Sequence, residues 1–305
     1  MSIAMRDAFG KKLVELGVTH PNLVVLDADV SSSTKSALFG KAYPERFFNV
    51  GVAEANMVDI AAGMATAGLR PVVNAFAIFL ALKATDQIRN TICYNNLPVI
   101  IAGAYGGLSD SFDGASHQAI TDIAIMRALP NMQVIVPSDS FQAEQALEYA
   151  LTQQGPVYIR LNRNAMPDLP RAAAISTVKV TEGSDVTIAA NGITASFAAE
   201  AAELLKKEGI KAEVFSVPMV KPFGIEAIVE SVAKTGRLLT VEEHVLAGGF
   251  ASAVSEVFMK RGISCRFDAI GIEDTFTESG PYIPLLAKYG ISAENIAARA
   301  MALSK

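Results

Sequence analysis

Short apolar runs alternate with helix-forming segments along this chain, and this alternation constrains its fold more than any other feature. In the first half we expect strands at residues 23–27, 47–49, 71–75, 98–104, 133–136 and 157–161. Between them we expect helices at 6–17, 54–68, 79–93 and 120–128, and a capped helix from 138 to about 153. Most of the strands are continuous apolar runs, which predicts a parallel sheet covered by helices on both faces.

The alternation starts again after a segment of different composition. Residues 164–179 contain Pro167, Pro170 and an Arg-Ala run, which are typical of a linker. Beyond it we expect strands at 185–190, 212–217, 237–241 and 265–269, and helices at 194–208, 225–233, 251–260, 282–289 and 293–303. The sequence therefore predicts an α/β chain of two domains, each a mainly parallel sheet covered by helices. The expected divisions are a first domain at 1–164, a linker at 165–182 and a smaller second domain at 183–305.

Composition narrows the functions open to such a chain. A net charge of −5 with no basic cluster argues against nucleic acid as a partner. No apolar run approaches the roughly 18 residues that cross a bilayer, and the N-terminus lacks the apolar core of a signal peptide. Cys93 and Cys265 lie far apart in apolar segments, which favours buried thiols in a reducing compartment. We expect a soluble cytoplasmic protein that binds neither nucleic acid nor a membrane.

Polar residues gather where the predicted strands end. In the first domain they occupy residues 27–33, 105–117 and 160–164, and in the second they follow a strand at 241–250 (VEEHVLAGGF). Ligands of open α/β sheets bind at the carboxyl ends of the strands, so these loops are the candidate sites. For the 241–250 loop we expect a site or an interface.

The residues by themselves leave the role of the first-domain loops open. A solvated surface loop is the simplest interpretation of Asp110, Asp113 and His117. Core packing is the simplest interpretation of Phe76 and Phe79, which stand at a strand-to-helix junction.

Searches for common short motifs are negative. The chain contains no GxGxxG, GxxxxGK(S/T), HExxH or GxSxG sequence. Its three histidines, His20, His117 and His244, do not group with cysteines as a metal site would require. The sequence therefore indicates no metal site on this chain.

Residues 47–59 (FFNVGVAEANMVD) place an acid, Glu54, in the first turn of a predicted helix. The apolar residues that follow lie all round the expected helix, which predicts a helix buried on every side with Glu54 at its mouth. Structural acids are common at this position because the positive end of the helix dipole favours them. The alternative is a buried carboxyl that keeps a proton for a cofactor or substrate. The residues alone favour the structural role.

Several motifs, in order along the chain, resemble those of transketolases. Those that resemble the pyrimidine-binding domain are FFNVGVAEANMVDIAAGMATAG from residue 47, NAFAIFLALKATDQIRN from 74, DGASHQ from 113, MRALPNMQVIVPSD from 126 and VYIRLNRN from 157. The segment TVEEHVLAGGFASAV, from residue 240, is similar to the C-terminal domain. The resemblance covers essentially the whole chain and implies the same two-domain fold.

The resemblance lacks one part, and this implies a partner chain. Full-length transketolases carry an N-terminal domain in which a GDG sequence and a following Asn bind Mg²⁺ and the diphosphate of thiamine diphosphate. This chain has no GDG, and its first domain begins at residue 1. It resembles the C-terminal subunit of a split transketolase. The resemblance implies thiamine diphosphate and Mg²⁺ as cofactors, an N-terminal subunit that binds the diphosphate and the metal, and an α₂β₂ assembly.

The resemblance also implies roles for residues near the cofactor. Glu54 matches the acid that hydrogen-bonds the pyrimidine ring, and Phe76 and Phe79 match the aromatic pocket on which that ring stacks. Val30 matches the residue that presses between the two cofactor rings, and Asp29 beside it is expected to contact the cofactor. The implied reaction transfers a two-carbon glycolaldehyde unit from a ketose phosphate to an aldose, with the cofactor carrying the difficult step.

Four further residues match the family's substrate contacts. Asp113 and His117 match residues that touch the donor hydroxyls, and His117 is also expected to be catalytic. Ser33 and Arg163 match residues that bind the terminal phosphate of the sugar, a suitable task for a hydroxyl and a guanidinium.

Two positions depart from the family pattern. Tyr105 stands where many transketolases have His, and Phe112 stands where they have Glu. We expect Tyr105 to contact the substrate. The resulting pocket is less charged and differently shaped, which leaves room for a branched or otherwise modified sugar phosphate.

Three other interpretations stay open. A deoxyxylulose phosphate synthase uses the same domain order, but normally carries its diphosphate domain on the same chain. The β subunit of a 2-oxoacid dehydrogenase is a separate chain, yet DGASHQ and PNMQVIVPSD look more like transketolase. Release of CO₂ from pyruvate separates both enzymes from a glycolaldehyde transferase. The third interpretation is a non-catalytic assembly subunit, against which the intact Glu54 argues.

Overall fold

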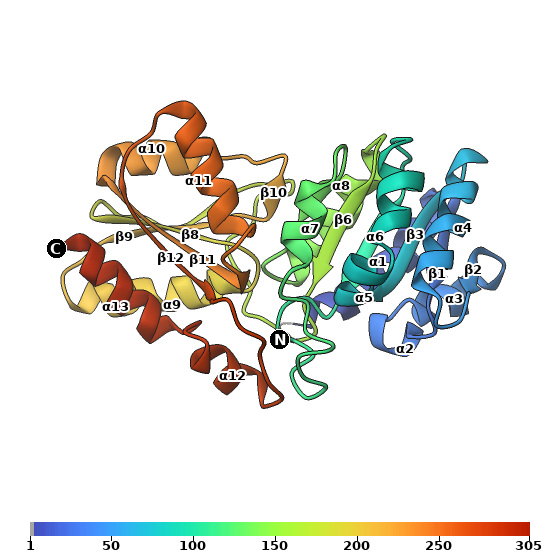
Figure 1. The fold of residues 1–305 in the computed structure, drawn as a ribbon, viewed down its shortest axis with the longest axis horizontal. Coiled ribbons are helices and arrows are strands. Elements are labelled where there is room, and N and C mark those ends of the chain that lie inside the picture. The colour runs from blue at the N-terminus through green and yellow to red at the C-terminus, as the bar shows by residue number, and fades with distance from the viewer. Residues whose placement is uncertain (1–2) are drawn as a thin grey trace.

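The computed structural model describes residues 3–305 and shows two α/β domains side by side (Figure 1). The first sheet has seven strands in the order β10-β5-β6-β4-β3-β1-β2, and the second has five in the order β12-β11-β8-β9-β7. The predicted architecture of two mainly parallel sheets covered by helices is therefore confirmed.

The elements follow one another as the apolar runs predicted, with some additions. Those of the first half are α1 (Met5–Thr19), β1 (Leu23–Asp27), α2 (Ser31–Thr34), α3 (Ala37–Ala42), η1 (Pro44–Arg46), β2 (Phe47–Asn49), α4 (Glu54–Thr66), β3 (Arg70–Phe76), α5 (Ala77–Lys83), α6 (Thr85–Gln87), η2 (Ile88–Cys93), β4 (Ile100–Ala104), α7 (Asp122–Ala128), β5 (Gln133–Ile135), α8 (Ser140–Thr152) and β6 (Val157–Leu161). Those of the second half are β7 (Val178–Thr181), β8 (Val186–Ala190), α9 (Thr194–Lys207), β9 (Ala212–Ser216), β10 (Met219–Lys221), α10 (Glu226–Thr235), β11 (Arg237–Val245), α11 (Phe250–Arg261), β12 (Arg266–Ile272), α12 (Tyr282–Lys288) and α13 (Ala293–Ser304).

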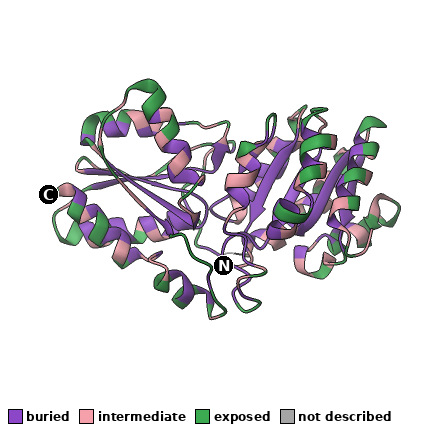
Figure 2. Ribbon diagram, viewed as in Figure 1, coloured by how far each residue is buried: buried purple, intermediate pink, exposed green. Residues whose placement is uncertain are grey.

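The strands of the first sheet end in register, and this sets the position of the loops that follow them. Asp27 pairs with Asn74, and Ala104 pairs with both Phe76 and Leu161, all in parallel ladders. Because parallel strands share one carboxyl edge, the segments after β1, β3, β4 and β6 lie along that edge. The strands themselves are mostly buried (Figure 2), as continuous apolar runs require.

One strand of the first sheet comes from the second half of the chain. β10 pairs antiparallel with β5, and the Val136 amide donates to the Pro218 carbonyl at 2.8 Å. No strand is expected here from the sequence, because β10 depends on pairing with β5, which lies far away in the chain. The two domains also share an apolar core that includes Phe9, Leu147, Ile188 and Leu286. They are therefore packed against each other rather than joined by the linker alone.

The expected loop at 241–250 is wrong in its first half. β11 continues to Val245, so that Glu242, Glu243 and His244 belong to a strand and are buried. Polar residues in a buried strand break the apolar pattern by which the strand end was placed.

Three other segments differ from expectation. The helix expected at 79–93 begins at Ala77 and is divided into α5, α6 and η2, the last of π geometry. α4 is not buried all round, because Asn56 and Asp59 are exposed on its outer face. In the segment expected as a linker at 165–182, β7 pairs antiparallel with β9, so the second sheet begins inside that range.

The structure also bears on the class of protein. Both cysteines are free; Cys93 is buried, whereas Cys265 is only half-buried. Within residues 3–305 no helix is both long and apolar enough to cross a membrane.

Candidate active site

The carboxyl edge of the first sheet brings together side chains from several separate segments. They come from α1, from α2, from the start of α4, from the β3–α5 junction and from the segments that follow β4 and β6. Direct contacts link Glu54, Lys83, Phe79, Phe76, His117, Tyr105, Arg163, Asp110, Arg6 and Ser33.

Glu54 is the first residue of α4 and is 5% exposed. Gly51, with φ of +76°, turns the chain just before the helix, a conformation that favours glycine. Within residues 3–305 the single hydrogen-bond partner of the carboxyl is Lys83, whose Nζ lies 3.5 Å from Oε1. The Lys83 side chain is 51% exposed and can move aside. Glu54 therefore presents a nearly buried carboxyl whose Oε2 has no protein donor among these residues.

Two phenylalanine rings are linked to this carboxyl through Lys83. The Phe76 and Phe79 rings are stacked at 27° with their centroids 5.8 Å apart, and both are half-buried. The Lys83 ammonium lies 4.2 Å from the Phe79 centroid, and the His117 ring meets Phe79 edge-on at 5.2 Å. Simple core packing does not describe these rings, because they lie outside the two large cores, beside a small separate apolar cluster.

The 105–117 loop is only partly the solvated surface expected from composition. Asp110 is 1% exposed, and its Oδ2 has no hydrogen-bond partner within residues 3–305. Its Oδ1 lies 3.3 Å from an Arg163 guanidinium nitrogen. Burial, together with the nearby charge of Asp113, raises the pKa of Asp110 to about 6. Asp113 itself is exposed, whereas His117 is half-buried against the Phe79 ring.

Two guanidinium groups face the Tyr105 ring. The Arg6 and Arg163 Cζ atoms lie 5.4 Å and 5.0 Å from its centroid. Arg6 also donates to the Tyr105 hydroxyl and, at 3.1 Å, to the Ser33 carbonyl. Arg6 could not be expected at this site from the sequence, because a single arginine in the first helix has no motif around it.

The loop after β1 is shaped by a buried acid. Asp27 Oδ1 accepts from the Val30 amide at 2.7 Å, and its Oδ2 accepts from the hydroxyls of Thr34 and Ser36, each at 2.8 Å. Burial raises the pKa of Asp27, and these donors oppose that shift. Asp29, at φ +67°, accepts a hydrogen bond from the Asn49 side-chain amide at 2.9 Å. The side chains of Val30 and Asp29 make no recorded contact with the Phe76–Phe79 pair, so their assignment to a cofactor stays a prediction.

The residues present define what this edge can hold. It offers two partly exposed aromatic faces, one carboxyl oxygen without a protein donor and two guanidinium groups around a tyrosine. A flat heterocycle and an anionic group fit these features. Within residues 3–305 no group of three or more His, Cys, Asp or Glu side chains is arranged to hold a metal ion.

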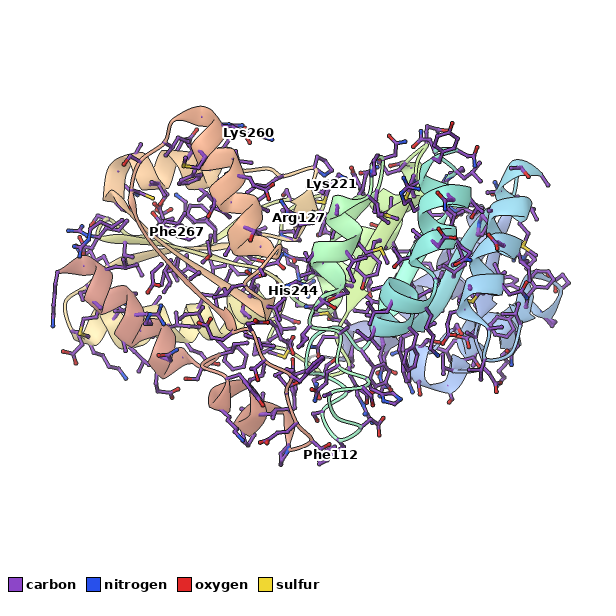
Figure 3. The ribbon with its side chains drawn as sticks, in the orientation of Figure 1. Phe112, Arg127, Lys221, His244, Lys260 and Phe267 are labelled. Carbon is purple, nitrogen blue, oxygen red and sulfur yellow. The ribbon has the colours of Figure 1, made fainter. Side chains whose placement is uncertain are left out.

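The polar residues of the second domain have a different environment. Glu242 accepts from the amides of Phe250 and Ala251 at 2.6 and 2.8 Å, at the start of α11. His244 Nε2 accepts from the Ala124 amide at 3.3 Å, and its Nδ1 donates to the Val245 carbonyl at 2.6 Å. His244 lies where the two domains meet (Figure 3). We expected a site or an interface for the 241–250 segment, and in the structure this segment forms an interface between the two domains of the chain.

The fold and this edge define a two-domain α/β protein whose first domain carries a candidate cofactor and substrate site. The model of the transketolase pyrimidine-binding domain matches residues 1–168, and the model of the transketolase C-terminal domain matches residues 176–296. The chain belongs to the transketolase family.

Individual relatives agree with this assignment. The chain is 41% identical over 303 residues to a protein of Methanocaldococcus jannaschii described as a transketolase C-terminal section, covering 97% of this chain and 95% of that one. It is 37% identical over 295 residues to the 1-deoxy-D-xylulose-5-phosphate synthase of Heliobacterium modesticaldum, covering 95% of this chain and 45% of the synthase. The chain thus spans about half the length of the synthases that it matches.

Solved structures show the same relationship. A split-gene transketolase described as an inactive β4 tetramer has a TM-score of 0.90 and 44% identity, over the full length of both chains. The transketolase of Campylobacter jejuni has a TM-score of 0.84 at 23% identity, over 99% of this chain and 47% of that one. The second comparison shows a shared fold alone.

Proposed function

We propose that this chain is the C-terminal subunit of a split transketolase, which transfers a glycolaldehyde unit from a ketose phosphate to an aldose. The observation that carries the proposal is a nearly buried Glu54 beside two stacked, half-exposed phenylalanine rings. The similarity to a split-gene transketolase over the full chain supports a separate N-terminal subunit. We expect that subunit and this one to assemble as α₂β₂.

The edge fits the aminopyrimidine half of thiamine diphosphate. Phe76 and Phe79 offer ring faces for stacking, and Glu54 Oε2 is available for a hydrogen bond to a ring nitrogen. When bound, the cofactor supplies the carbon nucleophile that attacks the ketose carbonyl. We assign Mg²⁺ and the diphosphate to the partner subunit, because the GDG motif that binds them in full-length transketolases does not occur in this sequence.

The chain's own residues then have defined tasks. Glu54 holds a proton at its carboxyl oxygen for the ring nitrogen of the cofactor. Lys83 has to leave its present contact, because its ammonium lies over the Phe79 face that the heterocycle needs. Val30 and Asp29 approach the cofactor from the loop that Asp27 holds in shape.

The substrate would lie between the 105–117 loop and the two guanidinium groups. We expect Asp113 and His117 to meet the donor hydroxyls, with His117, which lies against the Phe79 ring, moving protons at the reacting carbon's oxygen. Ser33 and Arg163 would bind the terminal phosphate, and Arg6 adds a second guanidinium beside them.

Tyr105 and Phe112 then bear on which sugar is accepted. The Tyr105 ring lies near both guanidinium groups, which makes it part of the proposed phosphate end of the pocket. Phe112 is 70% exposed at the tip of its loop (Figure 3). This arrangement supports a sugar phosphate that differs from the usual pentose phosphates.

Calorimetric titration with thiamine diphosphate and Mg²⁺ tests whether both subunits are needed to bind the cofactor. The isolated chain should bind the cofactor negligibly, and addition of the N-terminal subunit should restore binding. Tight binding by the isolated chain would contradict a cofactor site that is completed by the partner subunit.

A variant of Glu54 tests the role of the carboxyl. In the complex, the Glu54→Ala variant should lose turnover; full turnover without this carboxyl would mean that the chain serves assembly alone.

A second candidate activity is that of a 1-deoxy-D-xylulose-5-phosphate synthase. It is favoured by identities of 35–38% to such synthases over nearly the whole of this chain. Release of CO₂ from pyruvate by the complex would indicate that activity, or that of a 2-oxoacid dehydrogenase. Glycolaldehyde transfer without CO₂ release would indicate transketolase.

A further inference from the structure

The 105–117 loop lies against the C-terminal domain, and the contact begins at Glu243. This residue is 2% exposed, and its Oε1 accepts from the Leu108 amide at 2.8 Å. The Tyr282 hydroxyl donates to the same oxygen at 2.9 Å, and the Asn162 side-chain amide donates to Oε2 at 3.3 Å. The Leu108 amide is buried, and no other acceptor is recorded for it. Glu243 therefore satisfies a backbone group of the loop that would otherwise be costly to bury.

The loop backbone comes close enough to Glu243 to require a glycine. Gly107 has φ of +65°, and a Cβ at this position would overlap the Glu243 carboxylate. The left-handed conformation and the overlap both exclude a larger residue. The loop is thus fitted to this one side chain.

A second contact is made by residues 277–280, which we call the strap; it connects β12 to α12 in the C-terminal domain. The Gly280 amide donates to the Ser111 carbonyl at 2.9 Å. Gln118 donates to the Glu278 carbonyl at 3.0 Å, and the Thr277 hydroxyl donates to the Gln118 side chain. At Gly114, with φ of +79°, a Cβ would meet the Ser279 hydroxyl. The strap therefore holds the loop on both sides of Asp113.

The strand that carries Glu243 is itself fixed to the first domain. Arg160 donates to the Glu243 carbonyl at 2.9 Å, to the Ala119 carbonyl at 2.7 Å and to Asp122 at 2.9 Å. Burial alone would lower the pKa of Arg160, but the charges of Asp122 and Glu243 raise it above its ordinary value. This ion pair is fully buried, so β11 has little freedom to move relative to β6.

We propose that the C-terminal domain clamps the 105–117 loop in its substrate-facing conformation, with Glu243 as the central positioning residue. The clamp acts through the loop backbone at Leu108 and Ser111, and touches neither Asp113 nor His117 by a recorded hydrogen bond. It rests on the proposed function insofar as those two side chains contact the sugar. It gives the C-terminal domain a task in substrate binding although none of the residues assigned above to the pocket lies in that domain.

Hydrogen exchange of the isolated chain tests the clamp without any substrate. The Glu243→Ala variant should raise the exchange rate of peptides covering 105–118 by about ten-fold, because one buried hydrogen bond is worth about 1.4 kcal/mol. Glu243→Gln keeps an acceptor for the Leu108 amide and should stay near the wild-type rate. Thr277→Val loosens the strap and should raise exchange as well; this milder variant carries the test if Glu243→Ala does not fold.

Thr240→Val is a matched control for Thr277→Val. Thr240 is buried on the same strand as Glu243, and its hydroxyl has no hydrogen-bond partner within residues 3–305. Its substitution should leave the exchange of 105–118 unchanged. Equal exchange in wild type, Glu243→Ala and Thr277→Val would overturn the clamp.

Kinetics of the complex with the N-terminal subunit separate positioning from general damage. Glu243→Ala and Thr277→Val should raise KM for the ketose phosphate about ten-fold while the affinity for thiamine diphosphate changes less than about three-fold. Glu243→Gln should restore KM. A parallel loss of cofactor affinity would contradict a role confined to the loop. If Glu54→Ala kept full turnover, the proposed function would fall, but the exchange result would still decide the clamp.

Discussion

The carboxyl ends of the two sheets carry similar residues but use them in opposite ways. At the first sheet, Glu54 and Asp110 are buried yet keep oxygens with no protein donor among residues 3–305, and His117 is half-buried. At the second sheet, Glu242 and Glu243 are buried and accept hydrogen bonds from named donors. Acidic residues at a strand end thus form an interface where the rest of the chain donates hydrogen bonds to their carboxyl oxygens, and a candidate site where it does not.

Burial also shifts the ionisation of the groups in the second region. Burial raises the pKa of Glu242 to about 8 and that of Glu243 to about 7, and lowers that of His244 to about 4. His244 is therefore neutral near pH 7, as its one donated and one accepted hydrogen bond require. The second region is a satisfied polar interior, whereas the first keeps capacity for a ligand.

The largest expected effect is the loss of activity in Glu54→Gln at the first region. Turnover of the complex should fall by about 10²–10⁴-fold, the usual contribution of a positioned proton donor or acceptor. The midpoint of urea unfolding should barely move, because the carboxyl has only the Lys83 contact to lose. Asp59→Asn, on the exposed face of the same helix, is the matched control and should keep turnover. A large loss of stability in Glu54→Gln would show that this acid has a structural role like that of Glu242 and Glu243.

Glu243→Ala should have the converse effect, on stability. It leaves the Leu108 backbone amide and the Tyr282 hydroxyl without an acceptor and removes one of the two acceptors of the Asn162 side-chain amide, which should cost about 2–4 kcal/mol in the free energy of unfolding. Urea denaturation of the isolated chain measures it. Glu256→Ala, which breaks an exposed ion pair with Arg127, should cost less than about 1 kcal/mol. Equal costs would remove the distinction between a satisfied interior acid and a surface acid.

The pH dependence of stability gives a smaller effect with a defined sign. The folded-state pKa values of Glu242 and Glu243 lie above the ordinary value of 4.5, so their protonation favours the folded state. This stabilisation is complete below about pH 4.5 and is lost as the pH rises through 7 and 8. Lowering the pH from 8 to 6 should therefore add about 2 kcal/mol from Glu242 and about 1 kcal/mol from Glu243 to the free energy of unfolding. Glu243→Gln should show a smaller increase.

A third buried acid should respond in the opposite direction. Burial alone would raise the pKa of Glu213, but hydrogen bonds from Lys234, Ser231 and Lys179 lower it to about 2. Its stabilisation is present above about pH 4.5 and is lost as the pH falls toward 2. A stability curve that only rose on acidification would contradict this assignment.

The smallest expected effect is that of Lys83→Met. The pair with Glu54 is half-exposed on the lysine side, so its loss should change stability by less than about 1 kcal/mol. Because the ammonium lies over Phe79, its removal should strengthen binding of thiamine diphosphate to the complex by about two- to five-fold. Weaker binding in the calorimeter would show that Lys83 supports the cofactor instead of covering its place.

Much of the fold and part of the candidate site could be predicted from the pattern of neighbouring residues in the sequence. Continuous apolar runs such as LVVLD at 23–27 and VYIRL at 157–161 were enough to place strands and to imply a parallel sheet. The motif around Glu54 marked the acid that the fold holds at the first sheet's edge. Arg6 and β10 could not be predicted, because each depends on a neighbour more than 80 residues away in the chain: Arg6 on Tyr105, β10 on β5.

The sequence by itself determined the two α/β domains, the order of their strands along the chain and the family motifs, because periodicity and short-range order are written in neighbouring residues. Only the tertiary structure decided which polar residues would be satisfied. Glu54 and Glu243 both sit beside predicted strand ends, and nothing local distinguishes them. The donors that separate them, Leu108, Asn162 and Tyr282, come from three distant segments, and only folding brings these to one carboxylate.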